Sequence, residues 1–470
     1  MAERLSGCTL HHFSVHTSRH AIGPLATWFT ALFLLASPTF SAPAQETSRR
    51  PNVILIVGDD QGSIDLNCYG AKDLATPNLD SLASRGVRFT QFYAGSSICS
   101  PARATILTGR YPQRAQLPGM APSRRGRPGM PADQFTIAEL LKPAGYNTAF
   151  FGKWHLGMTM QTGPNRQGFD EFVGFRCGCI DNYSHFFYWD GPPHHDLWRN
   201  ETELWEPGTH LSRIIVREAQ AFLKENQSHP FFMELAFNTP HYPLQPFEPW
   251  ALHYKNYKEP RRTYAAWLST MDDCIGQMLA TLDELKLADN TLVIYLPDQG
   301  HSTEERANFG GGNAGPYRGS KFSLLEGGIR IPCIISLPGK IPQAQVRGQF
   351  AAAVDLFPTI AQLCGVALPE RKIDGVSLVR LLTDANAKGT HEQFHWQLGD
   401  QWAVRDGDWK LVINARDTKI DQKLQGADQT FLSDMSKDVT ETHNLAAQHA
   451  DVVQRLTALH EAWVQEVREQ

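Results

Sequence analysis

The sequence of 470 residues has no excess charge of one sign and almost no long apolar run. Lys and Arg number 44 against 49 Asp and Glu, a formal net charge of −5, which argues against a basic surface that binds nucleic acid. The one pronounced apolar run, Leu25–Ala36, is too short for a membrane span, which needs about 20 residues. We interpret residues 1–44 as a secretory signal peptide, because this run is followed by the small-residue sequence Ala42-Pro43-Ala44. We therefore expect an exported protein, periplasmic or extracellular (lysosomal or secretory in a eukaryote), without a stable membrane span.

Cysteine is also scarce, with eight residues in the chain. Cys8 would leave with the signal peptide, and an odd number of seven would remain, which points to one thiol with a task other than pairing. The most unusual position is Cys99, which stands shortly before Pro101 and Arg103. Pro101 suits the first turn of a helix. This places Cys99 at about the N-cap, where free N–H groups and a partial positive charge favour an anion.

Four continuous apolar runs each end in a polar turn. They span residues 52–60, 147–155, 231–241 and 291–301. Runs of this length are typical of strands that are buried on both faces. Helical patterns lie between them, at residues 78–86, 134–141, 212–225 and 264–287. This alternation predicts an α/β fold in which helices flank a large, mostly parallel central sheet.

The character of the sequence changes after about residue 375. Short strand-like pieces joined by Gly and Asp turns follow, and the chain closes with an amphipathic helix whose apolar face holds Val453, Leu456, Leu459, Trp463 and Val467. We therefore expect a main, catalytic domain over residues 51–375. A smaller C-terminal α+β subdomain with an antiparallel sheet would cover residues 376–470.

Acidic side chains follow two of the predicted strands. Asp59 and Asp60 end the first run, and Asp298 and Gln299 end the fourth. In open α/β sheets, ligands bind beyond the carboxyl ends of the strands. Either pair alone would be an ordinary turn, but three carboxylates and an amide at corresponding ends favour a hard divalent cation such as Ca²⁺ or Mg²⁺ over structural zinc.

Cationic and proton-transferring side chains accompany this acidic set. They are Arg103, Lys153, His155, His241 and Lys321. A lone histidine is usually a structural residue, but Lys153 and His155 both follow one strand and His241 follows another. So many positive groups around a divalent cation favour an anionic oxyester, a phosphate or a sulfate, as the substrate.

Together these residues resemble the formylglycine-dependent, arylsulfatase-like sulfatases of the alkaline-phosphatase superfamily. The matching segments, in the family's order, are PNVILIVGDDQG, CSPARATILTGRYP, GKWHLG, NTPHYP, PDQG and YRGSKFSLLEGGIRIP. The resemblance runs from about Pro51 to about Leu445. Two positions depart from the common pattern: Ala102 stands where the family most often has Ser, and Gln299 where it commonly has Asn.

The resemblance implies that a formylglycine-generating enzyme converts Cys99 to 3-oxoalanine (formylglycine). It also implies one Ca²⁺ per chain, with the metal ligands Asp59, Asp60, Cys99, Asp298 and Gln299. The catalytic positions of the family fall on Cys99, Arg103, Lys153, His155, His241 and Lys321. The implied reaction hydrolyses a sulfate monoester through a formylglycine gem-diol and a sulfated enzyme. In it, His241, with Lys321, protonates the leaving alcohol, and His155 removes the proton that releases sulfate.

A long insertion, residues 172–200, separates the second and third predicted strands and is rich in aromatic, His and Asn residues. Such side chains stack on sugar rings and hydrogen-bond to them, so we expect a sulfated carbohydrate, a glycosaminoglycan or other polysaccharide fragment, with aryl sulfates as artificial substrates. The candidate substrate-binding residues are Arg176, His185, His194 and His195. For each of them, packing within the loop is the alternative.

Two other functions compete with a sulfatase. The first is a phosphatase or phosphodiesterase of the same superfamily, but those relatives usually have a Ser or Thr nucleophile and more His and Asp ligands for two zinc ions. The second is a secreted carbohydrate-binding protein on an inactive sulfatase scaffold, which would result if Cys99 were not oxidised. The single acidic set and the motif Cys-x-Pro-x-Arg favour the sulfatase.

Overall fold

A computed structural model describes residues 50–418 and 422–468. The expected signal peptide, residues 1–44, lies outside the described residues. No helix within the described ranges combines the length and the apolar character that a membrane span requires.

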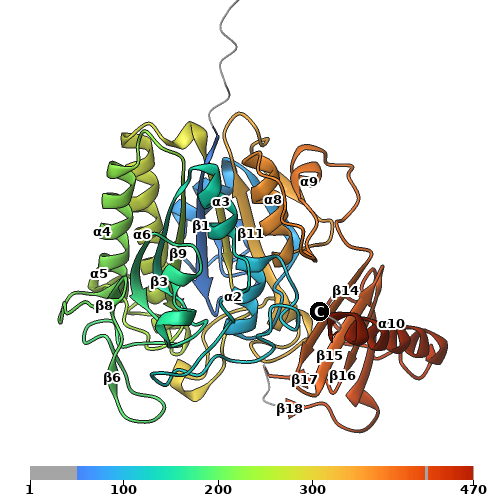
Figure 1. Ribbon diagram of the computed structural model, residues 1–470. Helices are drawn as coiled ribbons and strands as arrows, with labels where there is room; N and C mark the ends of the chain where they lie inside the picture. The colour runs from blue at the N-terminus through green and yellow to red at the C-terminus, as the bar shows by residue number, and fades with distance from the viewer. Residues whose placement is uncertain (1–49, 419–421, 469–470) are drawn as a thin grey trace, which may run out of the picture. The chain divides into compact units, whose positions relative to one another are not determined.

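The centre of the fold is an 11-stranded mixed sheet (Figure 1). Across the sheet the order is β12 (Gln345–Arg347), β2 (Val87–Tyr93), β11 (Arg330–Ser336), β10 (Thr291–Pro297), β1 (Asn52–Asp59), β9 (Phe231–Pro240), β3 (Asn147–Lys153), β4 (Glu171–Phe175), β7 (Trp198–Arg199) and β8 (Thr202–Glu203), with β13 (Ala351–Ala352) beside β2. From β10 to β4 all neighbours run parallel, whereas β11 is antiparallel to both of its neighbours. The predicted α/β fold is confirmed, and the four apolar runs form the adjacent strands β10, β1, β9 and β3.

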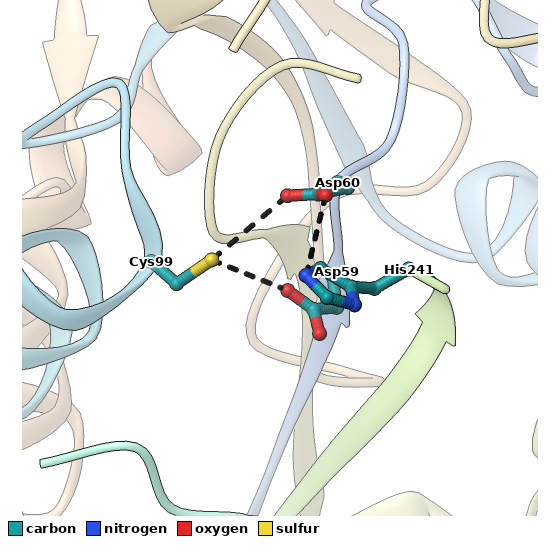
Figure 2. Close-up of side chains that lie close together, drawn as sticks. All are labelled: Asp59, Asp60, Cys99 and His241. Carbon is teal, nitrogen blue, oxygen red and sulfur yellow. Dashed lines mark hydrogen bonds and ion pairs between the residues drawn. The ribbon is translucent and has the colours of Figure 1, made fainter. Parts of the chain in front are cut away.

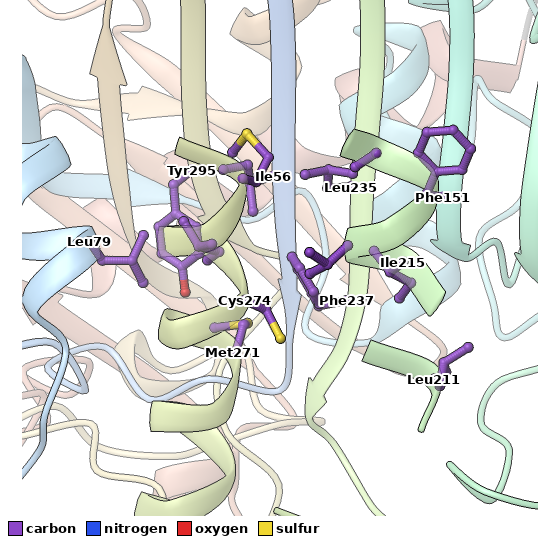
Figure 3. Packing of buried hydrophobic residues seen from close by; sticks show 14 of the residues in the cluster. Ile56, Leu79, Phe151, Leu211, Ile215, Leu235, Phe237, Met271, Cys274 and Tyr295 are labelled. Carbon is purple, nitrogen blue, oxygen red and sulfur yellow. The ribbon is translucent and has the colours of Figure 1, made fainter. Parts of the chain in front are cut away.

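Alternate residues of the central strands feed two separate cores. In β1, Ile54 and Ile56 pack on one face of the sheet, and Val53, Leu55 and Val57 pack on the other. The first face is covered by α1 (Pro77–Ser84), α4 (Leu211–Glu225) and α6 (Arg261–Glu284) (Figure 3). Helix α5 (Glu248–His253) packs against α6. The second face is covered by α2 (Cys99–Thr108), α3 (Ile137–Leu141), α8 (Leu356–Leu363) and α9 (Val379–Thr383). Because each strand is buried on both sides, its apolar run is continuous rather than alternating.

Local sequence signals explain the start of α3 and the end of α2. The Thr136 hydroxyl accepts a hydrogen bond from the Glu139 N–H, and the Glu139 carboxylate accepts one from the Thr136 N–H, so α3 begins with a capping box. Helix α2 ends at Gly109, whose φ of 65° is left-handed. A residue without a Cβ adopts that conformation at little cost.

The C-terminal part forms an antiparallel sheet, as expected. Its order is β14 (Gln393–Leu398), β15 (Gln401–Asp406), β16 (Trp409–Ile413) and β19 (Thr430–Asp434). Helix α10 (Ala450–Arg468) packs on this sheet (Figure 1) and buries Leu456, Trp463 and Val467 of its predicted apolar face. The remaining short elements are β5 (Phe186–Phe187), β6 (His194–His195), α7 (Glu326–Ile329), β17 (Arg416–Asp417) and β18 (Gln422–Lys423).

Candidate active site

The carboxyl ends of the parallel strands deliver the predicted site residues to one place. Asp59 ends β1, Lys153 ends β3, His241 follows β9, and Asp298 follows β10. Helix α2 begins at the same edge with Cys99 (Figure 2). Strand order therefore brings together side chains that lie up to about 240 residues apart in the chain.

Cys99 is buried against carboxylates. It is the first residue of α2, one position after the expected N-cap, and its Sγ lies 3.7 Å from Asp59 Oδ1 and 3.9 Å from Asp60 Oδ1 (Figure 2). Burial raises the pKa of the Cys99 thiol, although the charges of Lys153 and Lys321 oppose this. The sulfur is therefore a protonated thiol that donates to the carboxylates, not a thiolate nucleophile.

All seven cysteines within the described residues are free thiols. The odd count therefore does not single out Cys99, because none of the other six is used in a disulfide. What distinguishes Cys99 is its position between carboxylates and ammonium groups at the end of the sheet.

Two buried cations, Lys153 and Arg103, pair with Asp59 and Asp298. Lys153 Nζ lies 2.6 Å from Asp59 Oδ2, and both side chains are fully buried. Arg103 Nε donates to Asp298 Oδ2 at 3.0 Å. Its Nη2 forms ion pairs with the same oxygen at 2.9 Å and with Asp59 Oδ1 at 3.4 Å. Burial alone would raise the pKa of Asp59, but the adjacent Lys153 and the other cations lower it well below its usual range. Asp59 is therefore ionised.

Lys321 and His241 contact the other carboxylate, Asp60. Lys321 Nζ donates to Asp60 Oδ2 at 2.8 Å and lies 3.3 Å from Glu304. His241 Nε2 lies 3.7 Å from Asp60 Oδ2 (Figure 2), and its Nδ1 is 2.7 Å from the carbonyl oxygen of Tyr242. Because a carbonyl only accepts, Nδ1 carries the proton. Burial lowers the pKa of His241 well below its usual value, so Nε2 presents a lone pair to the site.

His155 is a neutral histidine held in a strained conformation. Its φ is 52°, and both ring nitrogens are buried without a hydrogen-bond partner. Burial, and then the charge of Lys153, lowers the pKa of His155 well below its usual value. A Cβ at Gly178 would lie 2.8 Å from the ring, so only glycine leaves room for it. A strained, unpartnered base beside the nucleophile position fits a role in proton transfer.

The acidic residues also fit a hard divalent cation. Ligand atoms of Asp59, Asp60, Cys99 and His241 all lie within 4.8 Å of one another, and Gln299 Oε1 is buried without a partner. Burial raises the pKa of Asp60 to about 7, with further contributions from Asp59 and Asp298. Burial also raises the pKa of Asp298, to about 6. This crowding of buried carboxyl groups is what a bound cation would relieve.

A pocket of about 340 Å³ opens above this cluster. Four of the predicted catalytic residues line it: Cys99, His155, His241 and Lys321. Aromatic side chains form its walls, namely Phe187, Trp189, Tyr242 and Phe322, and charged residues stand among them, namely Asp190, Glu304 and Arg306. Arg103 and Lys153 lie below the pocket floor, where they bind the carboxylates.

The four predicted substrate-binding residues do not line this pocket. Arg176 stacks over Trp198 at 4.3 Å and donates to the carbonyl of Asn200. The remaining three are taken up in packing of the insertion: His185 bonds to the Thr209 carbonyl, His195 stacks on Trp205, and His194 lies beside Phe187. Their role in substrate binding is a prediction that these contacts do not support.

The aromatic and charged residues of the pocket walls are not among those predicted from the sequence. Trp189 and Asp190 lie in the same insertion, in which the prediction names only His and Arg. Tyr242 directly follows His241, and this position in the chain is a signal that could have indicated it. Glu304 and Arg306 belong to a Gly-rich segment without periodicity, and only the fold brings them to Lys321.

A buried nucleophile position flanked by carboxylates, ammonium groups and two neutral histidines, of which His155 is unpartnered, fits a hydrolase of anionic esters. The chain belongs to the sulfatase family: the Sulfatase family model matches residues 51–366, and the model described as N-sulphoglucosamine sulphohydrolase, C-terminal, matches residues 319–469. It is accordingly a sulfuric ester hydrolase, and the predicted sulfatase activity is confirmed at this level.

Individual relatives agree with the family. The chain is 33% identical to human (Homo sapiens) steryl-sulfatase over 445 residues, covering 77% of this chain and 75% of that protein. It is 33% identical to N-acetylgalactosamine-6-sulfatase of Canis lupus familiaris over 372 residues, covering 75% and 69%. The crystal structure of Ps i-CgsB in complex with k-i-k-neocarrahexaose superimposes with a TM-score of 0.78 at 29% identity, covering 88% and 93%.

Proposed function

We propose that this sulfatase removes sulfate from a sulfated carbohydrate, with Cys99 converted to formylglycine and with Ca²⁺ as its metal. The observation that carries the proposal is the position of Cys99 on the floor of an aromatic pocket, between two carboxylates and close to Lys321. Two of the relatives act on or bind sugars by name, an N-acetylgalactosamine-6-sulfatase and a complex with a neocarrahexaose. This supports a carbohydrate over a sterol.

The state of the Cys99 sulfur favours conversion over direct use. A buried, protonated thiol is a poor nucleophile, and its pKa is raised. The hydrated aldehyde of formylglycine supplies one hydroxyl that attacks sulfur and a second whose deprotonation allows sulfate to leave. A formylglycine-generating enzyme is therefore a necessary partner during maturation, and Ala102 lies in the motif that this partner would read.

Ca²⁺ would be held by Asp59, Asp60, Asp298 and Gln299 together with the side chain at position 99. It would supply positive charge to an oxyanion at the nucleophile. Gln299 Oε1 is a suitable neutral ligand, since it is buried without a partner. Lys153 and Arg103 keep the neighbouring carboxylates ionised and so maintain the ligand set.

Protons would move at three side chains of the pocket. Lys321, whose pKa is held well above its usual value despite burial, chiefly by Asp60, donates a hydrogen bond and then a proton to the oxygen of the leaving alcohol. His241 Nε2 accepts from a group that lies over Asp60. This differs from the role expected for His241, which was to protonate the leaving alcohol with Lys321: because the Tyr242 carbonyl fixes the proton on Nδ1, Nε2 is an acceptor, and the protonation falls to Lys321 alone. His155, neutral and unpartnered, accepts the proton whose removal releases sulfate.

The walls of the pocket fit a sugar with one sulfate over the nucleophile. Trp189 and Tyr242 present rings 5.8 Å apart at an interplanar angle of 60°. The other charges are already paired: Asp190 with Arg124 at 2.7 Å, and Glu304 with Arg306 at 3.2 Å. Paired charges and aromatic faces bind hydroxyl groups and sugar rings without demanding a second anion. The expected signal peptide would place the enzyme where exported polysaccharides are found.

The test is sulfate release from a panel of sulfated oligosaccharides, with the corresponding phosphate esters and steroid sulfates beside them. The proposal predicts that one sulfated sugar is the preferred substrate. Trp189→Ala should raise KM for that sugar roughly tenfold and leave 4-nitrophenyl sulfate less affected, because one apolar contact contributes about 1–3 kcal/mol. A preference for phosphate esters, or for steroid sulfates with no effect of Trp189→Ala, would refute it.

A further inference from the structure

The segment that carries Lys321, residues 318–326, is bonded to the C-terminal sheet region rather than only to its own domain. The Ser320 N–H donates to Thr418 Oγ1 at 3.0 Å, and the Ser320 hydroxyl lies 2.8 Å from the same oxygen. At the far end of the segment, the Glu326 N–H donates to the Glu441 carboxylate at 2.6 Å. The C-terminal family model also begins at residue 319, so this segment and the sheet fall within one sequence unit.

Gln401, the first residue of β15, bonds the main chain directly after Lys321. Its Oε1 accepts from the Leu324 N–H at 2.8 Å, and its Nε2 donates to the Phe322 carbonyl at 3.0 Å. The side chain is 1% exposed. One carboxamide thus bonds main-chain groups two residues apart, as a neighbouring strand would, directly after Lys321.

These bonds enforce an unusual backbone. Phe322 has a φ of 71°, a left-handed conformation that is unfavourable for a bulky residue and persists only where the surroundings enforce it. Its N–H donates to the Ser97 carbonyl at 2.9 Å, two residues before Cys99, and its carbonyl accepts from Gln401. The backbone of Phe322 is therefore held on one side by Ser97, near Cys99, and on the other by Gln401 of the C-terminal sheet. This sets the direction in which the preceding residue, Lys321, leaves the main chain.

We infer that Gln401 is a positioning residue for Lys321, so that the C-terminal sheet takes part in protonation of the leaving alcohol. This inference rests on the proposed role of Lys321. In that step the S–O bond of the ester breaks, its electron pair goes to the leaving oxygen, and a proton passes from Lys321 Nζ to that oxygen. A small displacement of the donor weakens the transfer, while sulfate binding and nucleophilic attack remain.

The test is the leaving-group dependence of kcat/KM for aryl sulfates, from 4-nitrophenyl to phenyl sulfate, with the mature full-length enzyme. A good leaving group needs little protonation, whereas phenol needs more. Gln401→Met, which keeps the length of the side chain and removes both hydrogen bonds, should cost less than about threefold on 4-nitrophenyl sulfate and roughly 10- to 100-fold on phenyl sulfate. Lys321→Met should show the same trend with a larger loss.

Asn444 provides a matched control in the same sheet. Its Oδ1 accepts from the Leu432 N–H at 3.1 Å, and its Nδ2 donates to the Thr430 carbonyl at 3.0 Å, so it clamps β19 as Gln401 clamps the Lys321 segment. Asn444→Leu should lower the melting temperature without changing the leaving-group dependence. Thr418→Val, a milder change that releases Ser320, should act like Gln401→Met with a smaller loss.

The outcomes separate the inference from the role on which it rests. If Lys321→Met loses the same factor on every aryl sulfate, Lys321 is not the proton donor and both claims fail. The second outcome is that Lys321→Met shows the trend, but Gln401→Met and Thr418→Val leave the leaving-group dependence unchanged, as Asn444→Leu should. Gln401 is then only structural, and the inference alone is overturned.

Discussion

The Lys321 segment, residues 318–326, contributes to two clusters of buried charges that have different surroundings. The pocket cluster consists of Asp59, Asp60, Asp298, Arg103, Lys153 and Lys321. The Lys410 cluster consists of Lys410, Glu326, Glu441 and Arg330. In the Lys410 cluster, the fully buried ammonium lies 2.9 Å from Glu326 and 2.8 Å from Glu441.

The comparison teaches that burial and shifted pKa values do not by themselves mark a site. Burial would raise the pKa of Glu326, but Lys410 and Arg330 lower it to about 2. Burial, together with the charge of Glu326, raises the pKa of Glu441 to about 7, although Lys410 opposes this. These shifts are as large as those of Asp60 and Asp298, yet no residue of the Lys410 cluster lines the pocket. The pocket cluster differs because its Lys321 lines a cavity together with Cys99, His155 and His241.

Replacing one lysine in each cluster should show the difference between the two clusters most clearly. Lys321→Met should lower kcat for a poor leaving group by roughly 10²- to 10³-fold. It should cost less stability than the other change, because Lys321 and its partner Glu304 line the pocket, where water can solvate a carboxylate that has lost its cation. Lys410→Met should lower the free energy of unfolding by about 3–5 kcal/mol, since it leaves two buried carboxylates without their cation. Urea unfolding and steady-state kinetics measure the two effects.

The surface residue Lys437, paired with Asp434 at 2.7 Å, provides the control. Lys437→Met should change neither the activity nor the stability measurably. Equal stability losses for Lys321→Met and Lys410→Met, with equal activity per folded molecule, would remove the distinction between the two clusters.

Metal binding should distinguish the pocket cluster from the Lys410 cluster as well. Ca²⁺ at 100 times its dissociation constant should stabilise the folded protein by about 2.7 kcal/mol, and a chelator should remove both this stabilisation and the activity. Asp298→Asn should abolish the Ca²⁺-dependent rise in melting temperature, whereas Lys410→Met should keep it on a lower baseline. A rise that survives Asp298→Asn would place the metal elsewhere.

Much of the site could be predicted because its residues follow local patterns. Asp59, Lys153 and Asp298 stand where apolar runs end, and the order of parallel strands brings such ends together. The wall residues could not be predicted in this way, since Glu304 reaches Lys321 only through a loop without periodicity. Arg176 is predicted to bind substrate, but its guanidinium stacks over Trp198. Gln401 bonds to a segment almost 80 residues earlier, a contact that no sequence pattern records.

The smallest expected effect concerns pH and the C-terminal sheet. His395 is buried beside Trp463 and His460, and burial lowers its pKa to about 3. Above pH 6.5 it is neutral in both states and contributes nothing. As the pH falls below 6.5 the unfolded chain binds a proton that the folded chain does not, so at pH 5 stability is lower by about 2 kcal/mol.

The variant His395→Phe, which keeps an aromatic ring beside Trp463, tests this. Its free energy of unfolding should fall by about 2 kcal/mol less than that of the wild type between pH 7.5 and pH 5. An unchanged difference between the two pH values would mean that His395 is not buried in the neutral form. Activity per folded molecule should be the same in both proteins, because His395 does not line the pocket.

The central claim is that the group acting at position 99 is an aldehyde made from Cys99. Mass spectrometry of the tryptic peptide of residues 89–103 tests it directly, on enzyme from a host that has the formylglycine-generating enzyme. We predict a peptide in which the cysteine CH₂SH has become CHO, in a proportion that matches the sulfatase activity across preparations. Full activity in a preparation whose peptide carries only intact cysteine would contradict the account.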